Sequence, residues 1–531
     1  GVANRIYGSW GRVGGGYVNT AGYGCTVSGG YANKAYNPWS TVGGGTDNSA
    51  LTYYATIIGG YQNWAGAYAS TVGGGTYNTV YGSWSTVLGG YQNMAYGTWS
   101  HITGGFLNKA YSTGSNVGGG QYNTVFTSYS VVLGGSYNTV FSGEYGGVDG
   151  GSSNSIYSYA SSIGGGLQNI VASGQWSNII GGVNNYVNGY IATVGGGDTN
   201  TAYGECSSVG GGIGNYANTH SRISGGSDNM AQSYSCTVTG GIGNTAYYSY
   251  SLVSGGNSNL AYGYTSTVIG GFSNSAWGSY SFIGGGLYNS AYGDYASVTG
   301  GESNRAYQSG TVSGGYSNSA YVYSVVTGGA YNMASGYTAT INGGEYNTAS
   351  GSYSTVTGGR ENLAYASYST VTGGFQNTVN AYGGAITGGN NNQINAVDYG
   401  NSVIVGGEFN TVTESHGCVI GGGTYNYIYS AYSSMVGGGS ANSVTASYSV
   451  INGGMNNVVT DSYSKIGGGM SNSIRSGTHN VITGGENNII DGGYYSGIQG
   501  GYYNTITATA AVISGGALNK AGGYASVVTG G

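Results

Sequence analysis

The side chains capable of acid–base, nucleophilic or metal chemistry are few and widely spaced in this chain. Its 531 residues include four Cys, four His and sixteen Asp and Glu. No Cys or His pair has the short spacing typical of zinc sites. The local pair Glu414 and His416 indicates a solvated turn. We therefore expect no metal site, no cofactor and no enzymatic activity. The residues concerned are Cys25, Cys206, Cys236, Cys418, His101, His220, His416 and His479.

Aromatic side chains give the strongest functional signal. The chain has 57 Tyr and 7 Trp, and many of them stand directly before a Ser that recurs along the sequence. Exposed apolar stripes mark contact surfaces, and Tyr and Trp suit them because each combines an apolar face with a polar tip. Packing between chains and stacking on sugar rings both remain open. The candidate contact stripe consists of Trp39, Trp84, Trp99, Tyr250, Tyr280, Tyr353 and Tyr368.

The aromatic residues recur within a strict sequence repeat, which must determine their positions in the structure. An Asn follows a Gly-Gly pair about every fifteen residues, and the unit is Ser-x-Val-x-Gly-Gly-x-x-Asn-x-Ala-x-Gly-x-Tyr, as in residues 354–368. One apolar column is always Val or Ile, and the other, two residues after the Asn, is always Ala, Val or Ile. Residues two apart on a strand share a face, so each unit predicts two short strands with one inward face. Paired Gly and the lack of a 3.6-residue period exclude helix.

The chain is therefore predicted to be all-β, a parallel β-solenoid with about 35 coils of about 15 residues. Gly permits the sharp corner between strands, and Asn tolerates the left-handed backbone region. The Asn amides should donate to and accept from the Asn of neighbouring coils, forming a buried ladder. Its representative members are Asn33, Asn93, Asn244, Asn362 and Asn377.

The repeat runs through residues 1–531 as one continuous architecture. The second apolar column is Ala between Ala202 and Ala364 but Val or Ile from Val379 to Ile506. We therefore expect slimmer coils up to about residue 376 and wider coils with longer turns over 377–519, including a bulge near Asp398. Neither end resembles a cap, so the chain is either a stretch of a longer protein, which we favour, or a unit that stacks axially.

Composition narrows the partners. The ten Lys and Arg are scattered and the net charge is −6, so no nucleic-acid groove is expected. No run of apolar residues is long enough to span a membrane.

Three Cys occupy the Ser column as small substitutes for Ser. The spacing of the four Cys excludes a disulfide within the chain but leaves a disulfide between chains open. Each coil buries little apolar area, so we expect association with other copies, as a trimer or a lateral filament bundle.

Sixteen acidic residues do not form a site in this repeat. A glycosidase needs two carboxylates close together, and calcium-binding β-rolls carry an Asp in every unit, which this repeat lacks. Four Glu share the position after Gly-Gly but lie about three to five coils apart: Glu302, Glu345, Glu408 and Glu486.

The unit Ser85 to Gly97 resembles the head repeats of trimeric autotransporter adhesins of the YadA-like family, which also recur in phage tail fibres. The resemblance covers the whole chain and implies a left-handed parallel β-roll, a homotrimer, and adhesion to host matrix or cells. The chain departs from that family by a second Gly and an Asn in each unit. It also lacks the family's neck, stalk and anchor.

The pattern of residues 78–90 is similar to the repeats of grass-type ice-binding β-rolls. Ice binding needs a regular array of outward-facing residues. The residues that fit such an array are Thr237/Thr239, Thr355/Thr357 and Thr370/Thr372. The residues that interrupt it are Arg222, Phe282, Lys465 and Gly497. We therefore expect an extracellular, cell-surface or virion-surface structural and adhesive fibre, which associates with itself through its Tyr and Trp stripes. Glycans or extracellular matrix are further candidate partners. The alternatives are an ice-binding β-roll and a viral tail fibre.

Overall fold

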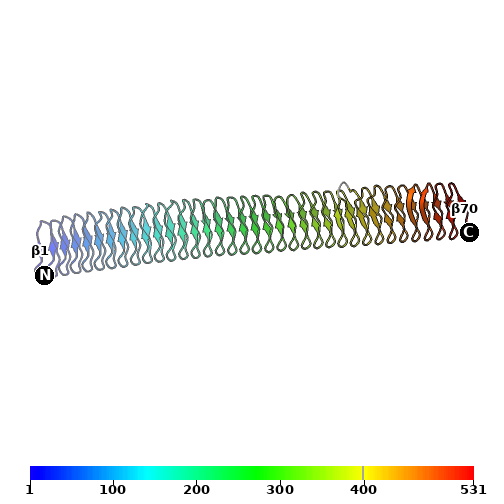
Figure 1. Ribbon diagram of the computed structural model, residues 1–531. Coiled ribbons are helices and arrows are strands. Elements are labelled where there is room, and N and C mark those ends of the chain that lie inside the picture. Colours follow the sequence, from blue (N-terminus) through cyan, green and yellow to red (C-terminus); the bar gives the residue numbers. More distant parts are fainter. Residues whose placement is uncertain (397–399) are drawn as a thin grey trace. The chain divides into compact units, whose positions relative to one another are not determined.

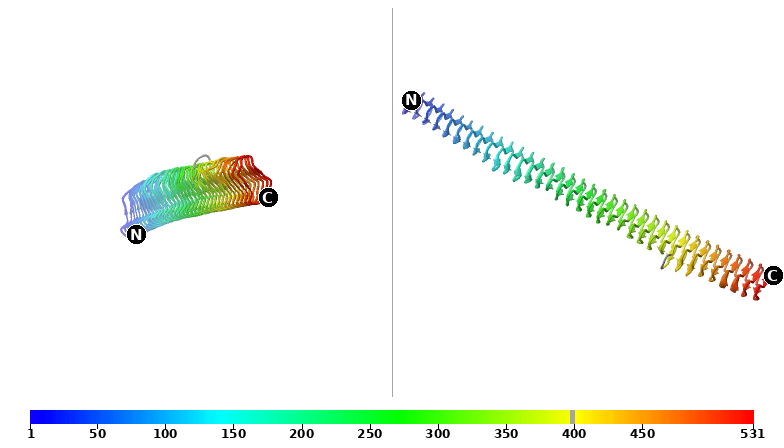
Figure 2. Two further views of the ribbon diagram at one scale, coloured as in Figure 1. Left: turned by 45° about the vertical axis from the view of Figure 1, so that its right-hand side comes forward. Right: turned by 90° about the horizontal axis from the view of Figure 1, so that it is seen from above.

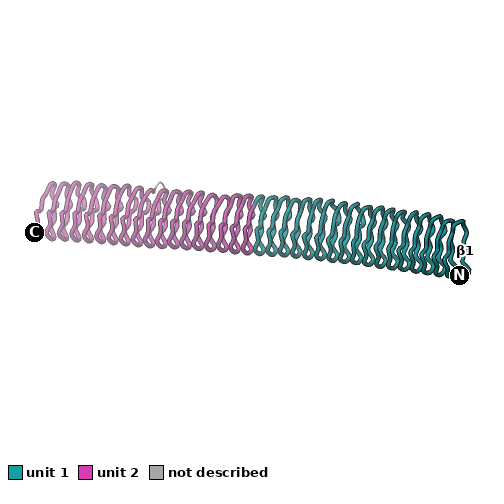
Figure 3. Tube along the Cα trace, turned by 180° about the vertical axis from the view of Figure 1, so that it is seen from behind, with its two compact units in different colours: residues 1–265 teal, residues 266–531 magenta. Residues whose placement is uncertain are grey.

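The computed structural model describes residues 1–396 and 400–531, and these residues are all-β (Figure 1). The chain divides into two compact units, Gly1–Thr265 (unit 1) and Ser266–Gly531 (unit 2), which Figure 3 colours separately. The described residues contain no helix, and hence no helix that could span a membrane. The bulge predicted near Asp398 lies outside the described residues.

Each coil contributes two strands, which follow the sequence pattern closely. Odd-numbered strands begin directly after the column Asn, as in β5 (Lys34–Ala35), and even-numbered strands end at the Val/Ile column, as in β6 (Thr41–Val42). The first and last strands are β1 (Arg5–Ile6) and β70 (Val527–Val528). Nearly all strands have two residues because the Gly corner and the aromatic turn confine them. The longer ones are β51 (Thr378–Asn380), β53 (Gln393–Asn395), β55 (Thr411–Thr413), β57 (Tyr427–Tyr429), β63 (Ser473–Thr478) and β65 (Ile489–Tyr494).

Equivalent strands of successive coils pair in parallel and in register within each unit. In unit 1, β10 (Thr71–Val72) pairs with β12 (Thr86–Val87), so that Thr71 lies beside Thr86 and Val72 beside Val87. In unit 2, β48 (Thr355–Val356) pairs with β50 (Thr370–Val371) in the same way. Figure 2 shows these coils following one another within a unit. The prediction of a parallel β-solenoid of about 35 coils is thus confirmed, whereas left-handedness stays a prediction.

A third line of parallel contacts joins the coils at the residue after Gly-Gly. Single-residue bridges connect Tyr61 with Thr76, Thr76 with Tyr91, and Tyr91 with Phe106. The sequence pattern did not indicate this line, because one residue per coil shows no strand periodicity. Each coil is therefore tied to its neighbours at three places rather than two.

The core is narrow and built from repeated columns. Val42 and Ala50, which represent the two apolar columns, are fully buried, and so are their equivalents through nearly all of the described coils. Whether the coils over 377–519 are wider than those before them stays a prediction.

The column Asn residues form the predicted ladder, with a different set of partners. Asn33, Asn93, Asn244, Asn362 and Asn377 are all fully buried. The side-chain oxygen of Asn229 accepts from the backbone N–H of Asn244 at 3.0 Å. The Asn244 amide nitrogen donates to the carbonyl of Gly240 in its own coil at 2.7 Å and to that of Gly256 in the next coil at 2.9 Å.

Most ladder bonds therefore run from side chain to backbone, and bonds between two Asn side chains add to them in some coils only. Examples of the latter are Asn93 to Asn78 at 3.1 Å and Asn377 to Asn362 at 3.2 Å. The expected left-handed Asn is also corrected. It is the residue before the Asn that is left-handed, as at Gln92 with φ 52°. This turn points the Asn amide inward, where it satisfies backbone groups that the short strands leave unpaired.

A second polar ladder follows the Ser column. Ser100 donates its backbone N–H to the Ser85 hydroxyl at 3.0 Å, and Ser85 donates to the Gly97 carbonyl at 2.6 Å. Cys25 takes a Ser place in this ladder, because its thiol lies 2.9 Å from the Asn37 carbonyl and 3.2 Å from the Ser40 hydroxyl. Cys236 and Cys418 are equally buried, which agrees with their interpretation as Ser substitutes.

The two glycines of the corner have different roles. Gly90 has φ +89°, and a Cβ there would clash with the Gly105 carbonyl and the Asn93 amide. Gly89 faces open space, and a Cβ at that position would meet no atom within 4 Å. The second glycine is thus required by backbone conformation and close approach between coils, while the first is not.

Candidate functional site

The predicted contact stripe lies on the outer surface of both units. Trp39, Trp84, Trp99, Tyr250, Tyr280, Tyr353 and Tyr368 are all exposed. Each occupies the left-handed position of the turn before the Ser column, for example Trp99 with φ 56° and Tyr368 with φ 58°. An L-residue there costs about 1 kcal/mol or more relative to Gly. The large side chains stand outward because the Ser that follows them points into the core.

Neighbouring coils bring these rings together. Tyr353 and Tyr368 stack with centroids 5.1 Å apart, and Tyr280 and Tyr295 stack at the same distance. Trp84 meets Tyr68 edge-on at 5.3 Å. Rings from the turn therefore form local clusters along each unit, and their role as contacts between chains stays a prediction.

Two further aromatic arrays on unit 1 were not recognised in the sequence. In the first, each ring stacks on the next at the position three residues after the Asn, at centroid distances of 4.6–5.6 Å. The second array lies beside the Gly corner. The sequence did contain a signal for the first array, because the position after the second apolar column is aromatic in consecutive coils. The first array is Tyr81, Tyr96, Tyr111, Phe126, Phe141 and Tyr157, and the second is Tyr61, Tyr77, Tyr91, Phe106, Tyr122 and Tyr137.

Burial changes the acidity of two half-buried phenols, one in each unit. Burial raises the pKa of Tyr96, and the neighbouring phenols Tyr111 and Tyr81 raise it further. In unit 2, burial raises the pKa of Tyr307, with Tyr321 adding to the effect.

Two files of small polar residues run along the even-numbered strands of unit 2. Over Ser297–Thr387, the residues before the core Val are half-buried and in register, as in the pairs Thr340–Thr355 and Thr355–Thr370. The residues after the core Val form the exposed file Thr299, Ser313, Thr327, Asn342, Thr357, Thr372 and Thr387. Only the exposed file is polar throughout this range, because Val325 and Ala385 interrupt the half-buried file.

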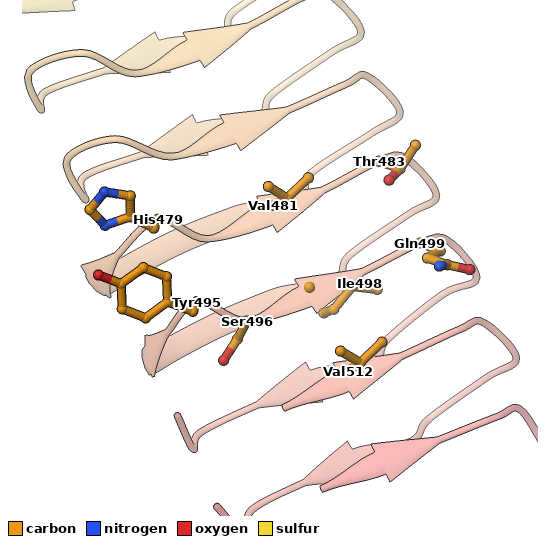
Figure 4. Close-up of a pocket in the computed structure, with 9 residues that line it drawn as sticks. His479, Val481, Thr483, Tyr495, Ser496, Ile498, Gln499 and Val512 are labelled. Carbon is orange, nitrogen blue, oxygen red and sulfur yellow. The ribbon is translucent and has the colours of Figure 1, made fainter. Parts of the chain in front are cut away.

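One of those interruptions opens a pocket. Gly497 stands in the outward column between Val481 and Val512, and its missing side chain leaves a shallow hollow of about 350 Å³. Figure 4 shows His479 and Tyr495 at one end of the hollow and Thr483 and Gln499 at the other. The two rings stack at 4.8 Å with an interplanar angle of 18°. The hollow therefore has stacked rings at one end and hydroxyl and amide groups at the other.

The structure also brings His220 close to Glu205 and Cys206 of the preceding coil. Glu205, Cys206 and His220 are exposed, and one ligand atom from each lies within 4.8 Å of the other two. Cys206 and His220 are one coil apart in the same column, so a 14-residue separation becomes direct proximity. The sequence spacing of Cys and His did not indicate this proximity, and the expected absence of a metal site stays a prediction.

Comparison with known proteins adds no assignment to these surfaces. No protein-family model matches the chain, and a search of curated proteins finds no match.

Proposed function

We propose that this protein is a non-enzymatic extracellular structural fibre that associates with other copies of itself through its aromatic arrays and presents aromatic and polar groups to glycans or matrix. The observation that carries the proposal is the run of exposed and half-buried rings on consecutive coils. Six successive coils of unit 1 place a ring in one column, from Tyr81 to Tyr157. Exposed apolar surface of this extent marks a contact site.

Self-association follows from the regularity of the array. Coils repeat about every 4.8 Å along a unit, so rings on two copies share one spacing and can interdigitate over many coils. The coil interior offers little apolar area of its own, since one of its two apolar columns is often Ala. Contact between copies buries the rings, and the polar tips of Tyr keep hydrogen-bonding partners at the edge.

Glycan contact uses the same chemistry at lower affinity for each coil. The His479–Tyr495 platform with Thr483 and Gln499 is one example of a ring beside polar groups. Many weak sites on one chain raise the overall affinity by orders of magnitude without a tight single contact.

Sedimentation velocity of the full chain tests the self-association. We expect concentration-dependent oligomers at micromolar protein, which shrink in a variant carrying Trp84→Ser and Trp99→Ser in the contact stripe and Phe126→Ser and Phe141→Ser in the first array. The matched control replaces four exposed or half-exposed threonines by serine, at Thr26, Thr41, Thr357 and Thr372, and should retain the oligomers. A wild-type monomer, or equal loss in the control, would contradict the proposal.

A glycan and matrix array separates adhesion from a purely structural role. We expect the wild-type chain to bind several related glycans or matrix proteins weakly and with strong dependence on surface density. Tyr495→Ala should reduce that binding only in part, because other platforms remain. Oligomers without any array binding would leave a structural filament.

Ice binding is a second candidate, favoured by the exposed polar file from Thr299 to Thr387 in unit 2 and by the neighbouring half-buried residues Thr340, Thr355 and Thr370. Thermal hysteresis and ice recrystallisation inhibition are the measurements. A variant with Thr357→Lys and Thr372→Lys should lose any such activity. The control Thr483→Lys with Gln499→Lys changes the same file outside the regular run and should keep it. No activity in the wild type would remove this candidate.

A further inference from the structure

Glu205, Cys206 and His220 form the only group of three or more metal-ligating side chains found within the described residues. All three are exposed at the turn edge of unit 1. Glu205 and Cys206 lie between β27 (Thr201–Ala202) and β28 (Ser208–Val209). His220 lies between β29 (Tyr216–Ala217) and β30 (Arg222–Ile223) of the following coil.

The coil geometry explains why these residues meet. Cys206 with φ 52° and His220 with φ 54° both occupy the left-handed turn position that elsewhere carries the aromatic stripe. The backbone N–H of His220 donates to the Glu205 carbonyl at 2.6 Å. This bond fixes the two turns one above the other. Two side chains at one column position therefore project side by side, with the Glu205 carboxylate next to them.

The donor set and the distances fit a borderline-soft divalent cation. Zn²⁺ takes thiolate, imidazole and carboxylate ligands at about 2.0–2.3 Å, so tetrahedral ligands lie about 3.5 Å apart. The three ligand atoms here lie within 4.8 Å of one another. Rotation of the exposed Glu205 and Cys206 side chains closes the remaining gap of about 1 Å. A sulfur ligand disfavours Ca²⁺ and Mg²⁺, which take oxygen ligands.

We propose that the Cys206 thiolate, a His220 ring nitrogen and a Glu205 carboxylate oxygen bind one Zn²⁺ at the turn edge of unit 1, with the fourth position open to solvent. Tyr234 packs edge-on against the His220 ring at 4.8 Å and an angle of 61°. This contact limits the rotation of the imidazole and orients it beside the thiol. The arrangement has the three protein ligands and open fourth position of reactive rather than closed zinc sites.

Three other Cys and one other His make different contacts and are not part of the cluster. Cys25, Cys236 and Cys418 are buried in the Ser ladder. His479 occupies the same turn position as His220 but stacks between Tyr463 at 5.0 Å and Tyr495 at 4.8 Å. The chain thus contains matched residues of each type outside the cluster.

Cobalt spectroscopy of the full chain, without an affinity tag and with reduced thiols, tests the site. We expect one Co²⁺ per chain, a near-ultraviolet charge-transfer band from thiolate to Co²⁺, and loss of that band when Zn²⁺ displaces Co²⁺. Cys206→Ser should abolish the band, and His220→Tyr, which restores the usual residue of the stripe, should weaken binding on the order of tenfold or more. Glu205→Gln should weaken it as well.

Two variants serve as matched controls. Cys236→Ser and His479→Tyr should leave both the band and the affinity unchanged, and circular dichroism should show the same β-structure in every variant. A band that survives Cys206→Ser, an unchanged affinity in His220→Tyr, or no stoichiometric binding of Co²⁺ or Zn²⁺ at micromolar protein would overturn the proposal. None of these outcomes affects the proposed self-association, which does not depend on a metal.

Discussion

Units 1 and 2 share one interior, but a stretch of coils in each carries a different outer surface. In both, the columns of Val, Ala, Ser and Asn are buried and equivalent strands lie in register. In unit 1, the residues after the core positions Ile57 and Val87 are Ile58 and Leu88, and both of these side chains are exposed. The residues before the same core positions are Thr56 and Thr86. Within Ser297–Thr387 of unit 2 the equivalent residues are polar, as at Thr355 and Thr357, whereas Ile269 and Val405 elsewhere in unit 2 are exposed apolar residues.

The difference shows which positions the fold constrains. An inward Val, Ile or Ala must fit a narrow core. An inward Asn or Ser must also make hydrogen bonds with the neighbouring coils. An outward residue meets only its equivalents above and below it. The outer files can therefore change from apolar to polar without altering the coil, and function is expected to depend on these files.

The largest expected effect comes from a charge in the shared interior. Val238→Asp in unit 1 and Val356→Asp in unit 2 each place a carboxylate in a fully buried column, which costs several kcal/mol. We expect similar local losses of protection in both units by hydrogen exchange and limited proteolysis. The matched outward substitutions Thr237→Asp and Thr355→Asp should have much smaller effects. A marked difference between the two units would show that their interiors are not equivalent.

Glycine substitutions should have the next largest effect and test the corner. Gly90→Ala and Gly344→Ala introduce a Cβ at φ +89° and +87°, against the carbonyl oxygen of the next coil. We expect each to lower the free energy of unfolding by more than about 1 kcal/mol. Gly89→Ala and Gly343→Ala meet no atom within 4 Å and should be nearly neutral. Equal losses within a pair, measured by thermal or denaturant unfolding, would contradict the distinction.

The sequence predicted the coil, both apolar columns and the Asn ladder because each repeats at every coil and has a clear physical role. The third line of bridges was missed because a single bridging residue leaves no strand pattern. The Asn partners were partly misassigned, since composition cannot say whether an amide bonds to another amide or to a carbonyl. Cys206 and His220 were missed because motif spacing assumes neighbours in the chain, whereas a solenoid makes neighbours of residues one coil apart.

Converting one surface into the other should change association more than stability. Ile58→Thr with Leu88→Thr gives unit 1 the polar files of unit 2 and removes two exposed apolar side chains. The free energy of unfolding should change by less than about 0.5 kcal/mol for each substitution. Sedimentation velocity should show weaker association than in the wild type. Unchanged association would restrict the contact surface to the turn stripe and the aromatic arrays.

The smallest expected effect is a loss of stability at alkaline pH, because both units contain stacked phenols. Burial raises the pKa of Tyr96 and of Tyr307 above the ordinary value of 10.0, and neighbouring Tyr residues add to the shift. As the pH rises past that value, the unfolded chain loses these protons before the folded chain does. The folded state then holds more protons, and the free energy of unfolding falls with pH. Below pH 10 the contribution is fully present.

Tyr96→Phe and Tyr307→Phe should each make the fall in melting temperature between about pH 9 and 11 slightly shallower, because Phe keeps the ring stack but has no proton to lose. Tyr524→Phe, which replaces an exposed Tyr near the end of unit 2, is the control and should leave the slope unchanged. If neither variant differs from the control, the stacked phenols ionise as freely in the folded chain as in the unfolded one.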